Sequence, residues 1–260
     1  MYAERDGARI WYEAVGEGEP LVMVAGFGAE HSFWSRAAAL LPAYTVVTLD
    51  NRGVGRTEYA GRFDTSDQAD DVIAVMDNLG LDRVHMLGWS MGSHIARNLA
   101  VRHRGRLADL VLVGTYLDRP ARSHYVLEGT LRSVLDGETS LRSLYAMINA
   151  FCLTEGAFEE FERVGRSPPL PDRYADPAGL MRQLEAVGGN DANARDIDVG
   201  VPTLIIHGSE DIMVPPSEGR KVAAVIPGSE YMELPGQGHR IPLGAYSGMI
   251  DGFFSRHPVH

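Results

Sequence analysis

A serine between two glycines marks the point in the sequence where chemistry is most strongly indicated. Residues 88–92 read Gly-Trp-Ser-Met-Gly, between a predicted strand at 83–87 and a predicted helix from Met91 to about Arg102. This is the Gly-x-Ser-x-Gly pattern of a nucleophile elbow, in which glycines relieve crowding at a sharp turn and leave the hydroxyl exposed. The start of the following helix favours negative charge at the same point. The chemistry indicated is attack by Ser90 on a carbonyl carbon.

Two later segments offer the residues that would activate this serine. At the motif the chain resembles the α/β-hydrolase family, whose catalytic residues follow in the order serine, acid, histidine. Residues 207–215, His-Gly-Ser-Glu-Asp-Ile-Met-Val-Pro, leave a predicted strand and are similar to the family's acid loop. This similarity implies Asp211 as the acid, with Glu210 as the alternative. Residues 236–239, Gly-Gln-Gly-His, follow the last predicted strand and resemble the histidine loop, which implies His239.

These three residue types suit one mechanism. A serine hydroxyl is a weak nucleophile until a base takes its proton, and imidazole titrates near neutrality. We expect His239 to act first as the base and later as the acid. A carboxylate on the far ring nitrogen fixes the tautomer and stabilises the imidazolium, which is the role expected of Asp211. Activity should then fall below about pH 6.

The resemblance also implies an oxyanion hole made of two backbone N–H groups. One belongs to Met91, which follows the nucleophile, and the other to Phe27, on the loop after the third strand. Many family members have a histidine before the first glycine of that loop, where this chain has Ala25. The departure leaves the donor in place because the donor is a backbone group. Trp89 and Phe27 are predicted to contact the substrate.

Other polar residues are interpreted as structural. Residues 50–57, with Arg52, are similar to a structural loop of the family. His94 lies one helical turn after Ser90 and is predicted to be a packed, hydrogen-bonded partner. The remaining histidines show no metal-ligand spacing, and neither a metal nor a cofactor is expected; they are His31, His85, His103, His124, His207, His257 and His260.

The composition excludes several classes of function. The 260 residues are 45% hydrophobic and 23% charged, which is ordinary for a folded globular protein and excludes intrinsic disorder. With 24 basic and 35 acidic residues the net charge is −11, so binding to nucleic acid or an anionic membrane is not expected. The single cysteine, Cys152, excludes an internal disulfide and a thiolate metal cluster. The longest apolar stretch, 21–25, is far too short to span a membrane, and a cytoplasmic protein is expected.

Short apolar runs alternate with helical patterns, which is typical of an α/β fold with a mostly parallel sheet flanked by helices. Residues 9–15, with the turn cluster 16–20, predict an opening hairpin. The other predicted strands are 21–25, 45–49, 83–87, 110–113, 202–206 and 230–234, and the predicted helices of this core are 35–41, 66–79, 91–102, 217–225 and one before Pro258.

The strand pattern stops near residue 117 and returns near 197. Between these points the helical stretches are 123–135, 141–151, 157–164 and 178–187, with a proline-rich connector at 167–171. We therefore predict an α/β-hydrolase core at 1–116 and 197–260, and a helical insertion at 117–196 after the sixth strand. In the family such an insertion is a cap that covers the serine and lines the substrate pocket.

The function implied is that of a serine hydrolase that cleaves a small-molecule carboxylic ester or lactone through an acyl-enzyme. The resemblance is to small bacterial carboxylesterases, enol-lactonases and acyl-carrier methyl-ester hydrolases. The same three catalytic residues also serve carbon–carbon bond hydrolases and cofactor-free perhydrolases, and some family members are ligand receptors with slow turnover. These alternatives stay open, because nothing in the core motifs separates them.

Overall fold

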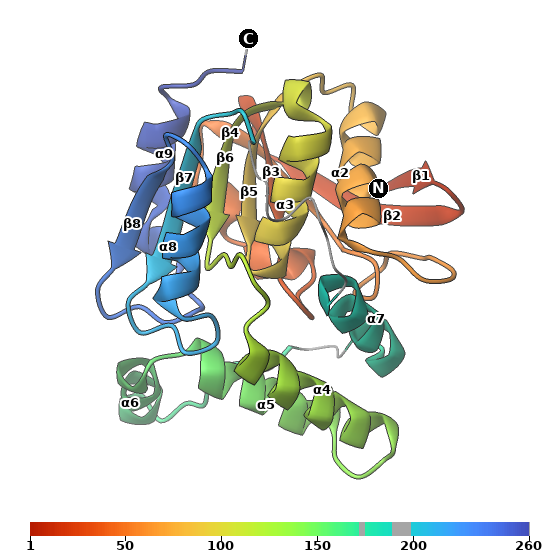
Figure 1. Cartoon of the computed structure of the whole chain (residues 1–260), viewed down its shortest axis with the longest axis vertical. Helices are drawn as coiled ribbons and strands as arrows, with labels where there is room; N and C mark the ends of the chain where they lie inside the picture. Colours follow the sequence, from red (N-terminus) through yellow and green to blue (C-terminus); the bar gives the residue numbers. More distant parts are fainter. Residues whose placement is uncertain (172–174, 189–198, 260) are drawn as a thin grey trace.

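One mixed sheet forms the centre of the molecule (Figure 1). The computed structural model describes residues 1–171, 175–188 and 199–259. Within these ranges eight strands lie in the order β1-β2-β4-β3-β5-β6-β7-β8. The β1–β2 and β2–β4 pairs are antiparallel and all the others are parallel. The strands are β1 (Tyr2–Arg5), β2 (Ala8–Val15), β3 (Glu19–Val24), β4 (Tyr44–Leu49), β5 (Val84–Trp89), β6 (Leu107–Val113), β7 (Thr203–Gly208) and β8 (Glu230–Leu234).

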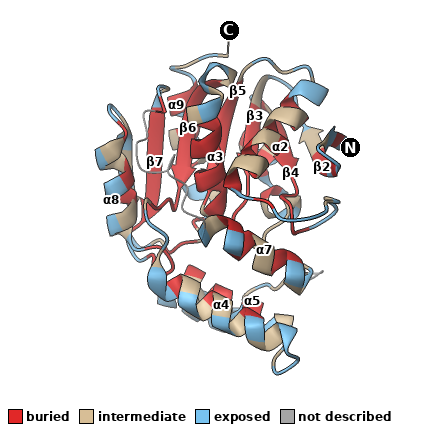
Figure 2. Ribbon diagram, turned by 45° about the vertical axis from the view of Figure 1, so that its right-hand side comes forward, coloured by how far each residue is buried: buried red, intermediate tan, exposed pale blue. Residues whose placement is uncertain are grey.

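The central strands are buried on both faces of the sheet, which explains the sequence pattern that predicted them. Every residue of β5, β6 and β7 is buried, so their sequences are mostly apolar and do not alternate between apolar and polar residues (Figure 2). The buried exceptions include His85 and Asp109, whose side chains lie 2.8 Å apart. The predicted opening hairpin is wrong in one respect. Its turn is at Asp6 and Gly7, both with positive φ, and it joins β1 to β2. The cluster at 16–18 instead leads from β2 to β3, which are not neighbours in the sheet.

Helices cover the two faces with separate apolar clusters. On one face pack α2 (Thr65–Asn78), α3 (Met91–Arg102) and α8 (Pro216–Val225). The other face is covered by α1 (Ala37–Leu40) and α9 (Ser247–Phe254). The sheet is therefore the middle layer of three, and its strand ends are fixed by packing on both sides.

Four helices without an intervening described strand lie between β6 and β7, as predicted. They are α4 (Ala121–Leu135), α5 (Leu141–Cys152), α6 (Glu155–Arg163) and α7 (Pro177–Gly188). Figure 1 shows this helical insertion beyond the carboxyl ends of the parallel strands. A third apolar cluster joins it to loops of the core, and it includes Leu144, Leu180 and Val214. The predicted boundary at 196/197 lies outside the described residues.

The part of the chain that the structure describes contains no helix that combines the length and apolar character needed to cross a membrane.

A buried ion pair anchors the loop after β4. Arg52 Nε and Nη2 donate to the two carboxylate oxygens of Asp71 at 2.7 and 2.8 Å. Both side chains are buried, and Arg5 approaches the same carboxylate at 3.4 Å. The interpretation of Arg52 as a structural residue fits this geometry.

Replacing Arg52 by methionine should lower the free energy of unfolding by about 3 kcal/mol, because the Asp71 carboxylate would stay buried with only Arg5 nearby. The measurement is urea unfolding followed by circular dichroism. The matched control is Arg9→Met, which breaks the exposed Arg9–Glu58 pair and should cost less than about 1 kcal/mol. Equal effects of the two substitutions would contradict this view of the loop.

Candidate active site

Ser90 occupies a strained turn between β5 and α3. Its φ of 55° and ψ of −120° lie in a region that side chains rarely adopt. The chain passes so close to itself that only glycine fits on either side. A Cβ atom on Gly88 would overlap the Gly92 carbonyl oxygen, and one on Gly92 would overlap the Val24 carbonyl oxygen. The turn presents the Ser90 hydroxyl at the carboxyl end of the sheet.

Three side chains from separate loops form one hydrogen-bonded row. His239 Nε2 lies 2.8 Å from Ser90 Oγ, and His239 Nδ1 lies 2.6 Å from Asp211 Oδ2. Asp211 follows β7 and His239 follows β8, so neighbouring strands bring the acid and the imidazole together. Glu210, the alternative acid, is exposed and does not approach the imidazole. The geometry is that of a nucleophile, a base and an orienting acid.

The Asp211 carboxylate receives further donors on its buried side. The Val214 amide donates to Oδ1 at 2.7 Å, and Nε2 of the fully buried His207 lies 3.3 Å from Oδ2. Burial alone raises the pKa of Asp211. The attraction of His239, the hydrogen bonds from both imidazoles and the Val214 amide outweigh burial and hold the pKa of Asp211 below its ordinary value. These contacts favour an ionised carboxylate behind His239.

The position of His207 was not predicted from the sequence, where it is one of the histidines without metal-ligand spacing. The signal was available, because His207 lies next to the last residue of β7, the strand that leads into the acid loop. Its Nε2 also lies 2.9 Å from the Val214 carbonyl oxygen, so one imidazole contacts two points of that loop. His207 is therefore a residue that positions Asp211.

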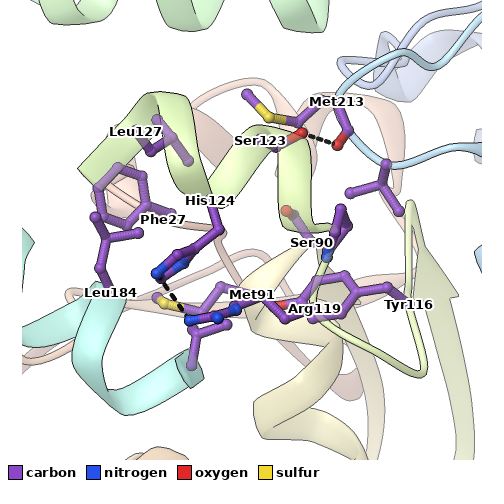
Figure 3. Close-up of a pocket in the computed structure, with 13 residues that line it drawn as sticks. Phe27, Ser90, Met91, Tyr116, Arg119, Ser123, His124, Leu127, Leu184 and Met213 are labelled. Atoms are coloured by element: carbon purple, nitrogen blue, oxygen red, sulfur yellow. Dashed lines mark hydrogen bonds between the residues drawn. The ribbon is translucent and has the colours of Figure 1, made fainter. Parts of the chain in front are cut away.

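A pocket opens beside Ser90 (Figure 3). Its volume is about 60 Å³, several times what one water molecule needs. Phe27 and Met91 come from the core, whereas Leu127 and Leu184 come from α4 and α7 of the insertion. The complete lining is Phe27, Ser90, Met91, Tyr116, Arg119, Pro120, Ser123, His124, Leu127, Leu184, Val187, Met213 and Val214.

Polar side chains also line this largely apolar pocket. Arg119 Nη1 lies 2.8 Å from His124 Nε2, as the dashed line in Figure 3 shows. Burial and the Arg119 charge lower the pKa of His124, and together they outweigh the Glu128 carboxylate, which raises it. Burial raises the pKa of Tyr116 to about 12, so this pocket residue carries a neutral phenol at neutral pH.

The two predicted oxyanion-hole residues both lie beside Ser90. Met91 is the first residue of α3, and Phe27 follows β3. A Cβ atom on Gly26, next to Phe27, would lie 3.0 Å from Ser90 Cβ, so the Phe27 loop touches the nucleophile directly.

The prediction that Trp89 contacts substrate does not fit the structure. Trp89 is only 6% exposed and is not among the residues that line the pocket. Its ring stacks on Phe33 with centroids 4.4 Å apart, and its Nε1 donates to the His239 carbonyl oxygen at 3.0 Å. The indole thus supports the histidine loop from behind. His94 is buried, with Nδ1 2.9 Å from an Arg97 nitrogen, as expected of a packed partner.

One group of described residues has ligand atoms close enough together for a metal ion, namely Glu30, His31 and Asp50. The Asp50 carboxylate already accepts from the backbone amides of His31 and Arg56 and lies 2.8 Å from the His31 ring. These bonds give the carboxylate a structural role, and we assign no metal to it.

The depressed pKa of Asp211 predicts how its contribution to stability depends on pH. A carboxyl group with a lower pKa in the folded state stabilises the fold above its unfolded pKa, about 3.9, and loses that contribution as pH falls through the folded value. Asp211→Asn should therefore lower the free energy of unfolding by about 1.5–3 kcal/mol between pH 7 and 5. The difference in unfolding free energy between wild type and the variant should become smaller below about pH 4. Urea unfolding at several pH values tests this, with the exposed Asp82→Asn as control. A difference that stays constant down to pH 3 would contradict it.

Comparisons with known proteins identify the family of the chain. Residues 19–245 match the family model described as alpha/beta hydrolase fold. A Pseudomonas putida protein named 2-hydroxy-6-oxononadienedioate/2-hydroxy-6-oxononatrienedioate hydrolase 2 is 30% identical over 253 residues, covering 89% of this chain and 85% of its own. The enol-lactonase of Burkholderia xenovorans LB400 superposes with a TM-score of 0.79 at 25% identity, over 97% of this chain and 96% of the other. A thermophilic esterase from Thermogutta terrifontis, 21% identical, shares the fold with a TM-score of 0.84 over 99% of both chains. The chain belongs to the α/β-hydrolase family.

Proposed function

We propose that this protein is a serine hydrolase that cleaves a small carboxylic ester or lactone through an acyl-enzyme. The observation that carries the proposal is the row Ser90–His239–Asp211, in which both hydrogen bonds are within 2.8 Å and the serine faces a pocket. A hydroxyl bonded to an imidazole that is itself bonded to a buried carboxylate is an activated nucleophile.

The proposed reaction proceeds in two halves. Ser90 Oγ attacks the carbonyl carbon while its proton passes to His239 Nε2, and the Phe27 and Met91 amides stabilise the negative oxygen. The bond to the leaving alcohol then breaks as His239 returns the proton to the alcohol oxygen. Water next gives a proton to His239 and attacks the acyl-enzyme carbon. The Ser90–acyl bond breaks, His239 returns the proton to Ser90, and the carboxylic acid leaves.

We further propose that the insertion at 117–196 is a cap on a core formed by 1–116 and 197–260. Two of its helices supply pocket residues, including Leu127 and Leu184. The small, mostly apolar space beside Ser90 favours a short acyl or alcohol group. The cap would then select the substrate while the core performs the chemistry.

The relatives support hydrolysis as the class of reaction, and one of them supports a second candidate bond. Both the enol-lactonase and the esterase share the fold over nearly the whole chain. The Pseudomonas putida relative is named for a 2-hydroxy-6-oxo compound, which carries a ketone in place of an ester. Hydrolysis of a carbon–carbon bond by the same three residues is therefore the second candidate.

Base-titrated hydrolysis of short-chain esters, long-chain methyl esters and small lactones tests the proposal. We expect turnover of the short esters or lactones, and a loss of at least about 10³-fold in kcat/KM in Ser90→Ala because the nucleophile is gone. The exposed Ser255→Ala is the control and should keep wild-type rates. More than a tenth of wild-type activity in Ser90→Ala would refute the mechanism. Cleavage of a 2-hydroxy-6-oxo-dienoate without ester cleavage would favour the carbon–carbon alternative.

A further inference from the structure

The loop that carries the Phe27 amide is a tight turn. The Ala29 amide donates to the Gly26 carbonyl oxygen at 3.2 Å, and Gly28 has a φ of 68°. The Gly26 carbonyl and the Phe27 N–H belong to the same planar trans peptide, so they point in opposite directions. Because the carbonyl points into the turn, the Phe27 N–H points out of it. The direction of this donor therefore depends on the turn keeping its shape.

Two helices of the insertion hold Gly28 by both of its backbone polar groups. The Gly28 amide donates to Gln183 Oε1 of α7 at 3.0 Å, and the Tyr145 hydroxyl of α5 donates to the Gly28 carbonyl oxygen at 3.0 Å. Gln183 is fully buried, and its Nε2 donates to the Arg52 carbonyl oxygen at 2.8 Å. One glutamine side chain thus links the Gly28 turn to the loop that the Arg52–Asp71 pair anchors.

The core holds the other end of the same segment. The buried Asn51 side chain donates to the Ala25 carbonyl oxygen at 3.0 Å. The turn is therefore fixed from the core at Ala25 and from the insertion at Gly28. No helix of the core bonds to Gly28 among the described residues, so at this end the turn relies on α5 and α7.

We propose that Gln183 and Tyr145 are positioning residues that align the Phe27 amide as an oxyanion donor, so that the insertion sets the rate of the chemical step as well as lining the pocket. This inference rests on the proposed function. Leu184, next to Gln183 on α7, lines the pocket beside Ser90. A substrate that packs against α7 therefore contacts the helix that holds the turn.

The test compares Tyr145→Phe and Gln183→Leu with wild type, and uses Arg182→Met as the matched control. Arg182 is also on α7 and also bonds the core, but its hydrogen bond goes to the Gly61 carbonyl oxygen and not to the Gly28 turn. We expect kcat to fall about 10- to 100-fold in Gln183→Leu and about 3- to 10-fold in Tyr145→Phe, with KM within about threefold, because an oxyanion donor acts mainly in the transition state. Arg182→Met should stay within about twofold in both constants.

A transition-state analogue separates positioning from general damage to the fold. An alkyl boronic acid forms a tetrahedral adduct with a nucleophilic serine, so its affinity should weaken by the same factor as kcat in each variant. Inhibition by the product carboxylate should change little. Unchanged kcat in both variants, or boronate affinity equal to wild type, would overturn the proposal.

Hydrogen exchange of the Gly28 amide gives a reading that does not depend on activity. It should be faster in Gln183→Leu than in wild type, and unchanged in Arg182→Met. Activity that survives in Ser90→Ala would refute the proposed function while leaving this exchange result intact. Wild-type exchange at Gly28 in Gln183→Leu would refute the clamp even if Ser90 proves essential.

Discussion

The structure depends on keeping one residue in a conformation that it would not adopt by itself. Ser90 has a positive φ between a buried strand and a helix, and a non-glycine residue held in such a region costs about 1–3 kcal/mol. The surrounding sheet maintains it, because β5 is paired on both sides and α3 packs against it. Glycines at 26, 88 and 92 allow the backbone to close around the turn. Everything else at the site is arranged relative to that hydroxyl.

A buried polar network, and not apolar packing alone, fixes Asp211 and His239. Asp211 contacts His239, His207 and the Val214 amide, and the His239 carbonyl accepts from Trp89. Buried charges of this kind are costly unless each is paired. Here the pairing keeps the carboxylate ionised and holds the imidazole in one orientation. The network thus joins the ends of β5, β7 and β8 into one site.

The features of the site that depend on residues close together in the chain could be predicted from the sequence. The glycine spacing around Ser90 and the mostly apolar strands follow from residue types within short windows. Asp211 and His239 follow from the resemblance of their loops to those of the family. Prediction failed where side chains meet across long separations. Gln183 and Tyr145 contact Gly28 from helices more than 100 residues away, and neither residue type is distinctive in an amphipathic helix. Trp89 adjoins Ser90 in the chain, but the turn at Ser90 changes the backbone direction, and the Trp89 indole packs on Phe33 and bonds the His239 carbonyl oxygen.

Covalent labelling would show whether the Ser90 hydroxyl is activated by His239. A fluorophosphonate reacts with a serine only when its hydroxyl is activated, and intact-mass analysis with peptide mapping shows which residue carries the adduct. We expect one adduct per chain, on Ser90, and a labelling rate at least about 100-fold lower in His239→Gln, where the base is missing. An adduct on another residue, or a wild-type rate of labelling in His239→Gln, would contradict the proposed roles of Ser90 and His239.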